Sequence, residues 1–212
     1  MAEASARSRP NRRTASPEQR RQQLVRATIR SIAKHGLSMT TVATVSKEAG
    51  LSQGIVNLHF KSKDRLLVET LKSLTDEYHE VWKRALEDSG DSPADKIRAL
   101  VAVDFKPRLC QRNKLAVWFA FWGESRSRPT YREICRQRDQ RYLEEMTRLC
   151  AELIGQGGYR GRRAAAVADG LLAMTEGLWL DLLMSPDQMN PETAHQICLD
   201  HLGYVFPDHF AA

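Results

Sequence analysis

Residues 50–67 read GLSQGIVNLHFKSKDRLL, which is a turn-forming glycine, a short helix-like run and then three basic residues within five positions. Val56 and Phe60, at i and i+4, share one face of that helix and are expected to point into a core. This orientation turns Ile55 and Leu58 toward the sides or the outside, next to the positive charges. Such an outer face suits the major groove of DNA, where apolar side chains contact thymine methyl groups.

The residues before this run predict its partner helix. Apolar side chains recur at helical spacing over 41–49, Gly50 supplies a tight turn, and Leu51 is placed to fill the angle between two crossing helices. Ser52 is expected to cap the second helix, over 52–60. Two short helices joined in this way form a helix-turn-helix, in which the second helix contacts base edges.

The outward side chains of this helix-turn-helix carry the groups that DNA contacts need. Gln53, near the start of the second helix, can pair bidentately with adenine. Thr41 and the free N–H groups that open the first helix are expected to hold one phosphate, and Lys61 with Lys63 another. The alternative is a solvated basic face on an ordinary helical bundle. The predicted DNA-binding residues are Thr41, Ser52, Gln53, Gly54, Ile55, Asn57, Leu58, His59, Lys61 and Lys63.

Positive charge is concentrated in the same part of the chain. The first 65 of the 212 residues hold 13 Lys and Arg against four Asp and Glu, a net charge of +9, whereas the remainder holds 19 against 22, a net charge of −3. Such asymmetry indicates that one end of the chain meets a polyanion. Residues 1–15, which include four arginines, are expected to form a mobile basic arm that follows the DNA backbone or enters a minor groove.

Helix signals dominate the rest of the chain, and no run of residues alternates as a strand does. A small polar residue followed by proline marks helix starts at Ser16, Ser92 and Asn190. We therefore predict an all-α protein of about nine helices, with a three-helix DNA-binding domain over 16–65 and a helical body over 66–212. The expected helices are 16–35, 41–49, 52–60, 62–88, 93–110, 114–125, 129–154, 162–184 and 191–205.

Several classes of protein are disfavoured. Four cysteines without a CxxC pair fit a reducing compartment better than a disulfide framework, and the longest apolar run, 115–122, is too short for a bilayer. With no apolar segment at the arginine-rich start, the sequence predicts a soluble, cytoplasmic protein without a membrane partner. His195, Cys198 and His201 spread over too wide an arc to chelate a metal, and the GQGGYRG loop at 155–161 lacks the register of a nucleotide loop. No cofactor and no catalytic residues are expected.

Aromatic residues cluster in KLAVWFAFWGES, residues 114–125, and again in MTEGLWLDLL, residues 174–183. The first segment places two tryptophans at i and i+4, and the second places a tryptophan near a carboxylate. Rings beside a carboxylate suit a quaternary ammonium, which offers charge but no N–H donor, and each ring face contributes about 0.5 to 2 kcal/mol. The alternative is that these rings are ordinary core. The predicted ligand-binding residues are Asp104, Phe105, Trp118, Phe121, Trp122, Glu176 and Trp179.

The stretch MTTVATVSKEAGLSQGIVNLHFKSKDRLL, residues 39–67, resembles the DNA-binding head of the TetR family of bacterial one-component regulators. The TTV opening, the EAG turn and the FKSKDRLL entry to the next helix carry the resemblance. It implies a homodimer that binds a palindromic operator, usually as a repressor, with 52–60 as the reading helix and Lys63 on a phosphate. The chain departs from the family at Asn57 and His59, two candidates for a further phosphate contact, because tyrosine is common at both positions.

The segments WFAFWGES and EGLWL are similar to the corresponding parts of BetI-type repressors, the TetR branch that senses choline and controls its conversion to glycine betaine. This similarity implies choline or a related cation as the effector. A hydrophobic or aromatic effector, a helical enzyme acting on choline and a sequence-indifferent DNA-binding protein remain as alternatives. Apolar stripes on the last two helices, together with the resemblance, imply a four-helix dimer interface. The stripe residues are Val167, Leu171, Met174, Leu178, Ala194, Ile197, Cys198, Leu202 and Val205.

Overall fold

A computed structural model describes residues 15–210 of the chain. Within these residues ten helices follow one another and no strand occurs, which confirms the predicted all-α class. The basic arm predicted over 1–15 lies almost wholly outside the described residues. The helices are α1 (Pro17–Met39), α2 (Val42–Ala49), α3 (Gln53–Phe60), α4 (Lys63–Glu87), α5 (Pro93–Asp104), α6 (Arg112–Glu124), α7 (Pro129–Gly157), α8 (Ala164–Met184), α9 (Pro191–Val205) and α10 (Pro207–Phe210).

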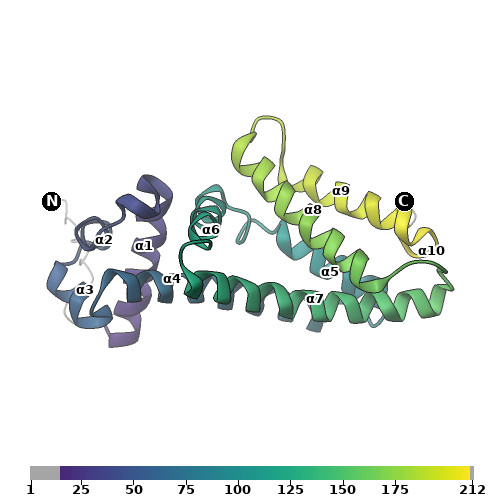
Figure 1. Ribbon diagram of the computed structural model, residues 1–212, viewed down its shortest axis with the longest axis horizontal. Helices are drawn as coiled ribbons and strands as arrows, with labels where there is room; N and C mark the ends of the chain where they lie inside the picture. Colours follow the sequence, from purple (N-terminus) through teal and green to yellow (C-terminus); the bar gives the residue numbers. More distant parts are fainter. Residues whose placement is uncertain (1–14, 211–212) are drawn as a thin grey trace, which may run out of the picture.

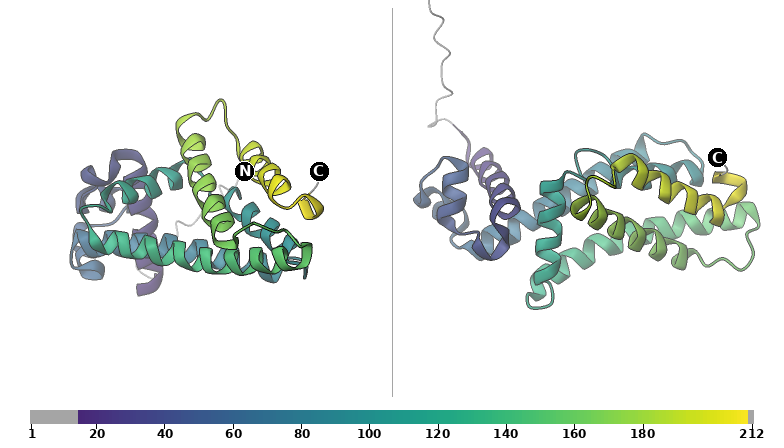
Figure 2. Two further views of the ribbon diagram at one scale, coloured as in Figure 1. Left: turned by 45° about the vertical axis from the view of Figure 1, so that its right-hand side comes forward. Right: turned by 90° about the horizontal axis from the view of Figure 1, so that it is seen from above.

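The head formed by α1, α2 and α3 lies at one end of an elongated molecule, and the remaining helices form the body (Figure 1). The long helices α4 and α7 run lengthwise through the body, and α4 connects it directly to the head. Helix α6 stands between the head and the far end of the body, while α8 and α9 lie next to each other along one side (Figure 2). None of the helices in residues 15–210 is long and apolar enough to cross a membrane.

The three helix starts marked by a polar residue and proline are capped as predicted. Ser16 and Gln19 form a capping box, with the Ser16 Oγ accepting from the Gln19 N–H at 3.2 Å and the Gln19 Oε1 accepting from the Ser16 N–H at 2.9 Å. Ser92 accepts from the third residue of α5 at 3.1 Å, and Asn190 accepts from the third residue of α9 at 2.8 Å. Local chemistry therefore decides where these helices begin.

The predicted end of α5 at residue 110 is wrong, because the helix ends at Asp104. Pro107 has no N–H, its ring clashes with the carbonyl four residues earlier, and it disfavours helical geometry at Lys106. The freed carbonyl of Asp104 instead accepts a hydrogen bond from the Trp179 Nε1 of α8 at 2.9 Å. The end of α5 is thus tied to a helix 75 residues away in sequence.

Helix α1 and the segment after α9 also differ from the sequence prediction. Helix α1 extends to Met39 and not to residue 35, with a kink at Gly36, whose φ of 79° is easily adopted only by glycine. The short α10 was not predicted. Its Phe210 is buried, and the guanidinium carbon of Arg98 lies 4.2 Å from the centre of its ring.

Head and body have separate hydrophobic cores. The head core joins eight buried residues of α1 to α4, which are Leu24, Val25, Ala27, Val45, Ala49, Val56, Phe60 and Leu66. The body core includes Ile32 and Leu37 from the second half of α1, and Leu67 from the start of α4. Helices α1 and α4 therefore belong to both cores and connect the two parts mechanically.

Candidate functional site

The helix-turn-helix has the orientation that the sequence predicts. Gly50 adopts a left-handed conformation with φ of 64°, and the N–H of Leu51 donates to a carbonyl of α2 at 2.9 Å. Val56 and Phe60 are only 1% and 3% exposed, whereas Leu58 is 74% exposed. Helix α3 therefore buries one face in the head core and presents the other to solvent.

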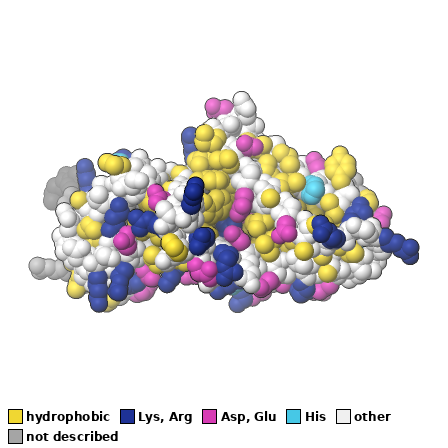
Figure 3. All heavy atoms as spheres, in the orientation of Figure 1, with side chains coloured by type: hydrophobic (Ala, Val, Ile, Leu, Met, Phe, Trp, Pro, Cys, Tyr) yellow, Lys and Arg dark blue, Asp and Glu magenta, His cyan; other side chains and the backbone are white. Residues whose placement is uncertain are grey.

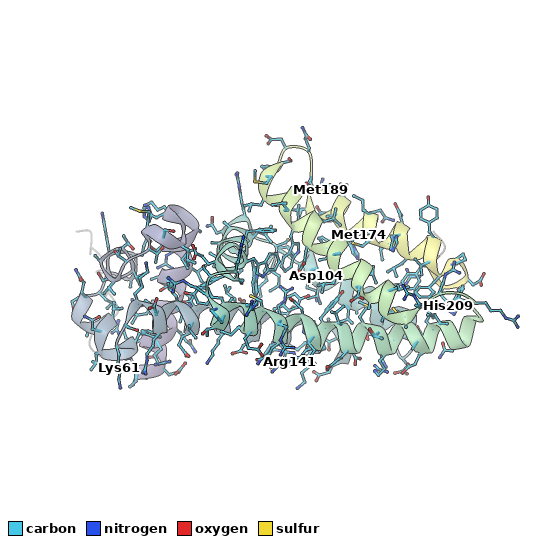
Figure 4. The ribbon with its side chains drawn as sticks, in the orientation of Figure 1. Lys61, Asp104, Arg141, Met174, Met189 and His209 are labelled. Atoms are coloured by element: carbon cyan, nitrogen blue, oxygen red, sulfur yellow. The ribbon has the colours of Figure 1, made fainter. Side chains whose placement is uncertain are left out.

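The predicted DNA-binding residues divide into an exposed group and a half-buried group. Gln53, Gly54, Asn57 and Leu58 form the exposed outer surface of α3, here called the reading face. Lys61, which Figure 4 places at the outer edge of the head, follows this face directly. The half-buried members are Ile55, His59 and Lys63, and the exposed members at the helix starts are Thr41 and Ser52.

One local prediction in the head is wrong in detail. Ser52 occupies the N-cap position of α3, but within residues 15–210 its hydroxyl makes no capping hydrogen bond. The hydroxyl of Thr41, in contrast, accepts from the Thr44 N–H at 3.1 Å and caps α2. An exposed, uncommitted hydroxyl thus stands at the start of the reading helix, where free N–H groups and the helix dipole favour an anion.

Arg21 of α1 stabilises the C-terminal end of α3, a role that was not predicted from the sequence. Its Nη1 donates to the His59 carbonyl at 3.2 Å, and its Nη2 pairs with Glu69 of α4 at 3.0 Å. Its guanidinium carbon lies 4.8 Å from the centre of the Phe60 ring. The reading face is therefore held by contacts to both neighbouring long helices.

In the body, three tryptophans from two helices come together as predicted. The ring centres of Trp118 and Trp122 on α6 lie 6.0 Å apart, and those of Trp122 and Trp179 on α8 lie 6.4 Å apart with an interplanar angle of 11°. Tyr78 of α4, which was not predicted, lies edge-on to Trp179 at 6.2 Å. We call these four residues the aromatic box.

Asp104 lies beside this box in the interior of the body (Figure 4). Its Oδ1 accepts a hydrogen bond from the Tyr78 hydroxyl at 2.6 Å. Burial raises the pKa of the Asp104 carboxyl from 3.8 to about 7, although the Tyr78 hydrogen bond and the charge of Arg138 on α7 act in the opposite direction. A buried carboxyl that titrates near neutrality next to stacked rings is typical of a functional site.

Three other predicted ligand residues lie apart from the ring cluster or are already paired. Phe105 faces His195 at 6.0 Å, and Phe121 packs edge-on against Tyr131 at 5.1 Å, so both rings are core residues outside the aromatic box. Glu176 is half-buried, and its Oε1 accepts from Arg138 at 3.1 Å. Phe121 shares α6 with Trp118 and Trp122 but lies outside the aromatic box, because its ring packs against Tyr131 of α7.

Arg138 of α7 is the principal site residue that the sequence analysis missed. Its side chain is 3% exposed and its guanidinium carbon lies 5.1 Å from the ring centre of Trp118 and 5.4 Å from that of Trp122. The available signal was its register, because Arg138 falls in the buried stripe of α7, four residues before Tyr142 and three after Cys135. A cation in an otherwise apolar stripe marks a buried, paired charge.

Several buried polar atoms of the body find no hydrogen-bond partner among the residues that the structure describes. Among them are Asp104 Oδ2, Arg138 Nη1, Tyr142 OH, Thr175 Oγ1 and His195 Nε2. Burial raises the pKa of Tyr142, and the charge of Asp104 raises it further. Native interiors rarely leave such groups unpaired, so this region suits a polar ligand group or ordered water. The described residues contain no group of three or more His, Cys, Asp or Glu that is placed to hold a metal ion.

The apolar stripes predicted on the last two helices mostly face the chain's own core. Buried members are Leu171, Leu178, Ala194, Cys198 and Leu202. The outer surfaces of α8 and α9 instead expose Leu180, Met184, Ile197 and Tyr204. Hydrophobic side chains gather visibly on the molecular face over α6 and the end of α8 (Figure 3). An apolar surface of this kind typically marks an interaction site.

Comparisons with protein families and with named relatives all identify bacterial transcriptional regulators. Residues 24–70 match the family of bacterial regulatory proteins named after TetR, and residues 93–207 match the C-terminal family of BetI-type transcriptional repressors. The HTH-type transcriptional regulator BetI of Stenotrophomonas maltophilia is 34% identical over 87% of this chain and 92% of that protein. The protein of the same name from Burkholderia mallei is 33% identical over 89% of this chain and 94% of that protein.

Solved structures share the fold. A transcriptional regulator from Pseudomonas aeruginosa PAO1 superposes with a TM-score of 0.81 at 25% identity, covering 93% of this chain and 95% of that one. A transcriptional regulator from Saccharomonospora viridis, solved in complex with choline, superposes with a TM-score of 0.78 at 21% identity, covering 87% of this chain and 96% of that one.

Proposed function

The chain belongs to the TetR family and is a transcriptional repressor of the BetI type, and we propose that its effector is choline or a closely related quaternary ammonium compound. By this proposal it controls glycine betaine synthesis or uptake. The observation that carries the proposal is the aromatic box, whose tryptophan and tyrosine rings adjoin the buried Asp104. Relatives named BetI and a choline complex of the same fold support it.

The site matches both ends of choline. A trimethylammonium group has no N–H to donate, so ring faces and a nearby carboxylate are its natural partners. The hydroxyl group at the other end both donates and accepts hydrogen bonds. The unpartnered Oδ2 of Asp104 and hydroxyls of Tyr142 and Thr175, all buried in the same body core, offer such partners. A purely apolar effector leaves these groups unsatisfied, at a cost of about 1 to 3 kcal/mol each.

Trp122→Ala is expected to weaken choline binding about 5- to 30-fold, since losing one desolvated ring face costs about 1 to 2 kcal/mol. Titration of choline against tryptophan fluorescence measures the effect. Trp122 is half-buried, so its loss leaves most of the body core in place. Tyr204→Phe, which changes an exposed ring on α9 outside the aromatic box, should bind choline as the wild type does. No quenching of the wild-type protein at millimolar choline would argue against the proposed effector.

For DNA, we propose that α3 lies in the major groove and that its reading face contacts base edges. Gln53→Ala should cost about 1 to 3 kcal/mol at one base position. Lys63→Ala should weaken binding to all sequences and lower the salt slope by about 1, because a lysine on phosphate carries no sequence information. Fluorescence anisotropy on operator and on random DNA, over a range of salt, separates the two. Equal losses on both DNAs for both variants would refute this division of roles.

Operator release follows from geometry if the protein acts as a homodimer joined through α8 and α9. A dimer reads a palindromic operator only when its two reading helices lie about 34 to 36 Å apart, one helical turn of DNA. We propose that the ligand-free dimer has this spacing and that choline favours a wider one. A gel shift on the chain's own upstream region, with and without choline, tests release. Sedimentation that finds a monomer at micromolar concentration would contradict the dimer.

A further inference from the structure

The aromatic box already holds a cation that belongs to the protein. The guanidinium carbon of Arg138 lies 5.1 Å from the ring centre of Trp118, 5.2 Å from Tyr78, 5.4 Å from Trp122 and 6.0 Å from Trp179. Each distance is within the range of about 6 Å over which a ring attracts a cation. The position at which an ammonium group would gain most from the rings is therefore filled by a side chain.

The guanidinium of Arg138 is incompletely hydrogen-bonded in the aromatic box. Its Nε donates to Asp139 at 2.6 Å and its Nη2 donates to Glu176 at 3.1 Å, and both carboxylates are partly open to solvent. Its Nη1 is buried without a hydrogen-bond partner in residues 15–210. A buried cation with an unsatisfied donor is stabilised less than a fully paired one. The position of Arg138 in the aromatic box is therefore open to competition.

Arg138 also lines a cavity of about 180 Å³ between α4 and α7. This cavity offers the Arg138 side chain a second position outside the aromatic box. Its walls carry one carboxylate, Asp76, and two further cations, Lys72 and Arg141. Figure 4 shows Arg141 on the outer side of α7. The net positive charge of the walls disfavours a third cation. This repulsion keeps the guanidinium among the rings until a ligand competes for them.

We propose that Arg138 is a built-in competitor that determines effector specificity: its guanidinium occupies the site of the effector's cationic group, and an effector binds by displacing it toward the cavity between α4 and α7. The inference rests on the proposed function, since it concerns the same aromatic box. Exchange of one monocation for another keeps the charge among Asp104, Asp139 and Glu176 constant. A neutral or anionic ligand would leave these carboxylates without their cation, so the site selects compact monocations that gain from all four rings.

The first test compares choline affinity in variants without the internal cation. Arg138→Ala is expected to bind choline at least about tenfold more tightly than the wild type, because no side chain must be displaced. Arg138→Met, which keeps an apolar chain of similar length, gives a second variant if alanine compromises folding. Arg136→Met is the matched control, since Arg136 is exposed on the same helix and pairs with Glu133 at 2.8 Å. Unchanged or weaker binding by both Arg138 variants would overturn the inference.

The second test uses no choline and asks whether a guanidinium group binds in the aromatic box. Ethylguanidinium at millimolar concentration should raise the melting temperature of Arg138→Ala by about 2 to 4 °C and leave the wild type unchanged, because only the variant has the site open. Absence of stabilisation in the variant would overturn the inference. If ethylguanidinium stabilises the variant but neither protein binds choline, Arg138 is confirmed as the occupant and choline is the wrong effector. If wild type and variants bind choline equally strongly, choline is confirmed as a ligand and Arg138 does not compete with it.

Discussion

The wild-type chain is expected to lose stability as the pH rises from about 4 to about 7, and Asp104→Asn is expected to abolish most of this pH dependence. Burial raises the pKa of Asp104 from 3.8 in the unfolded chain to about 7 in the folded one. Between these values the folded state binds more protons than the unfolded state, so the free energy of unfolding falls with rising pH. A shift of this size corresponds to about 4 kcal/mol, fully present below pH 3.8 and lost above pH 7.

The groups around Asp104 do not reverse this sign. The hydroxyl of Tyr78 on α4 and the cation of Arg138 on α7 lower the carboxyl pKa, whereas the charge of Glu176 on α8 adds to the effect of burial. Denaturant unfolding of wild type and variant at pH 5, 6, 7 and 8 measures the difference in slope. Asp181→Asn, an exposed carboxylate on α8, should keep the wild-type slope. Parallel slopes for Asp104→Asn and wild type would show that another group carries the dependence.

The same ionisation predicts how effector binding responds to pH. In Arg138→Ala no internal cation lies beside Asp104, so a bound choline favours the ionised carboxyl and should bind at least about tenfold more tightly at pH 8 than at pH 6. In the wild type choline replaces the charge of Arg138, so its affinity should change much less over this range. In Asp104→Asn the affinity should be lower and independent of pH over this range. Calorimetric titrations at the two pH values provide the measurement, since proton release adds a heat that depends on the buffer.

Phe60→Ala is expected to unfold the head while the body stays folded. Truncating a buried phenylalanine costs about 3 to 5 kcal/mol, which is a large part of what a core of eight residues can supply. Operator binding should then be lost, while choline binding persists. All four tryptophans lie in the body, at positions 82, 118, 122 and 179. Circular dichroism should therefore show lost helix at a temperature where tryptophan fluorescence is still native.

Leu58→Ala is the matched control for this experiment, because Leu58 is exposed on the opposite face of the same helix. Its stability should stay within about 0.5 kcal/mol of the wild type, with only operator affinity reduced. If Phe60→Ala instead unfolds head and body in one transition, α1 and α4 couple the two cores into a single unit. The proposed division between a DNA-binding domain and a body would then be wrong.

The sequence by itself determined the features that depend on residues close together in the chain. The caps at Ser16, Ser92 and Asn190 and the turn at Gly50 follow from contacts within one or two helical turns. The inward face that Phe60 shares with Val56 follows from helical spacing. The spacing of Trp118 and Trp122 placed both rings on one face of α6 for the same reason. Local hydrogen bonding and helical periodicity act in any tertiary context, so these features are readable without a structure.

Only the tertiary structure decided which helix faces meet. Spacing shows which residues share a helix face, but not how far each helix is rotated about its axis or which neighbour it crosses. For this reason Phe121 lies outside the aromatic box, Tyr78 lies inside it, and most of the stripes on α8 and α9 face the chain's own core. Arg138 is the clearest case, since a cation can be buried only where rings and carboxylates from several helices converge on it. That convergence depends on packing between segments far apart in the chain.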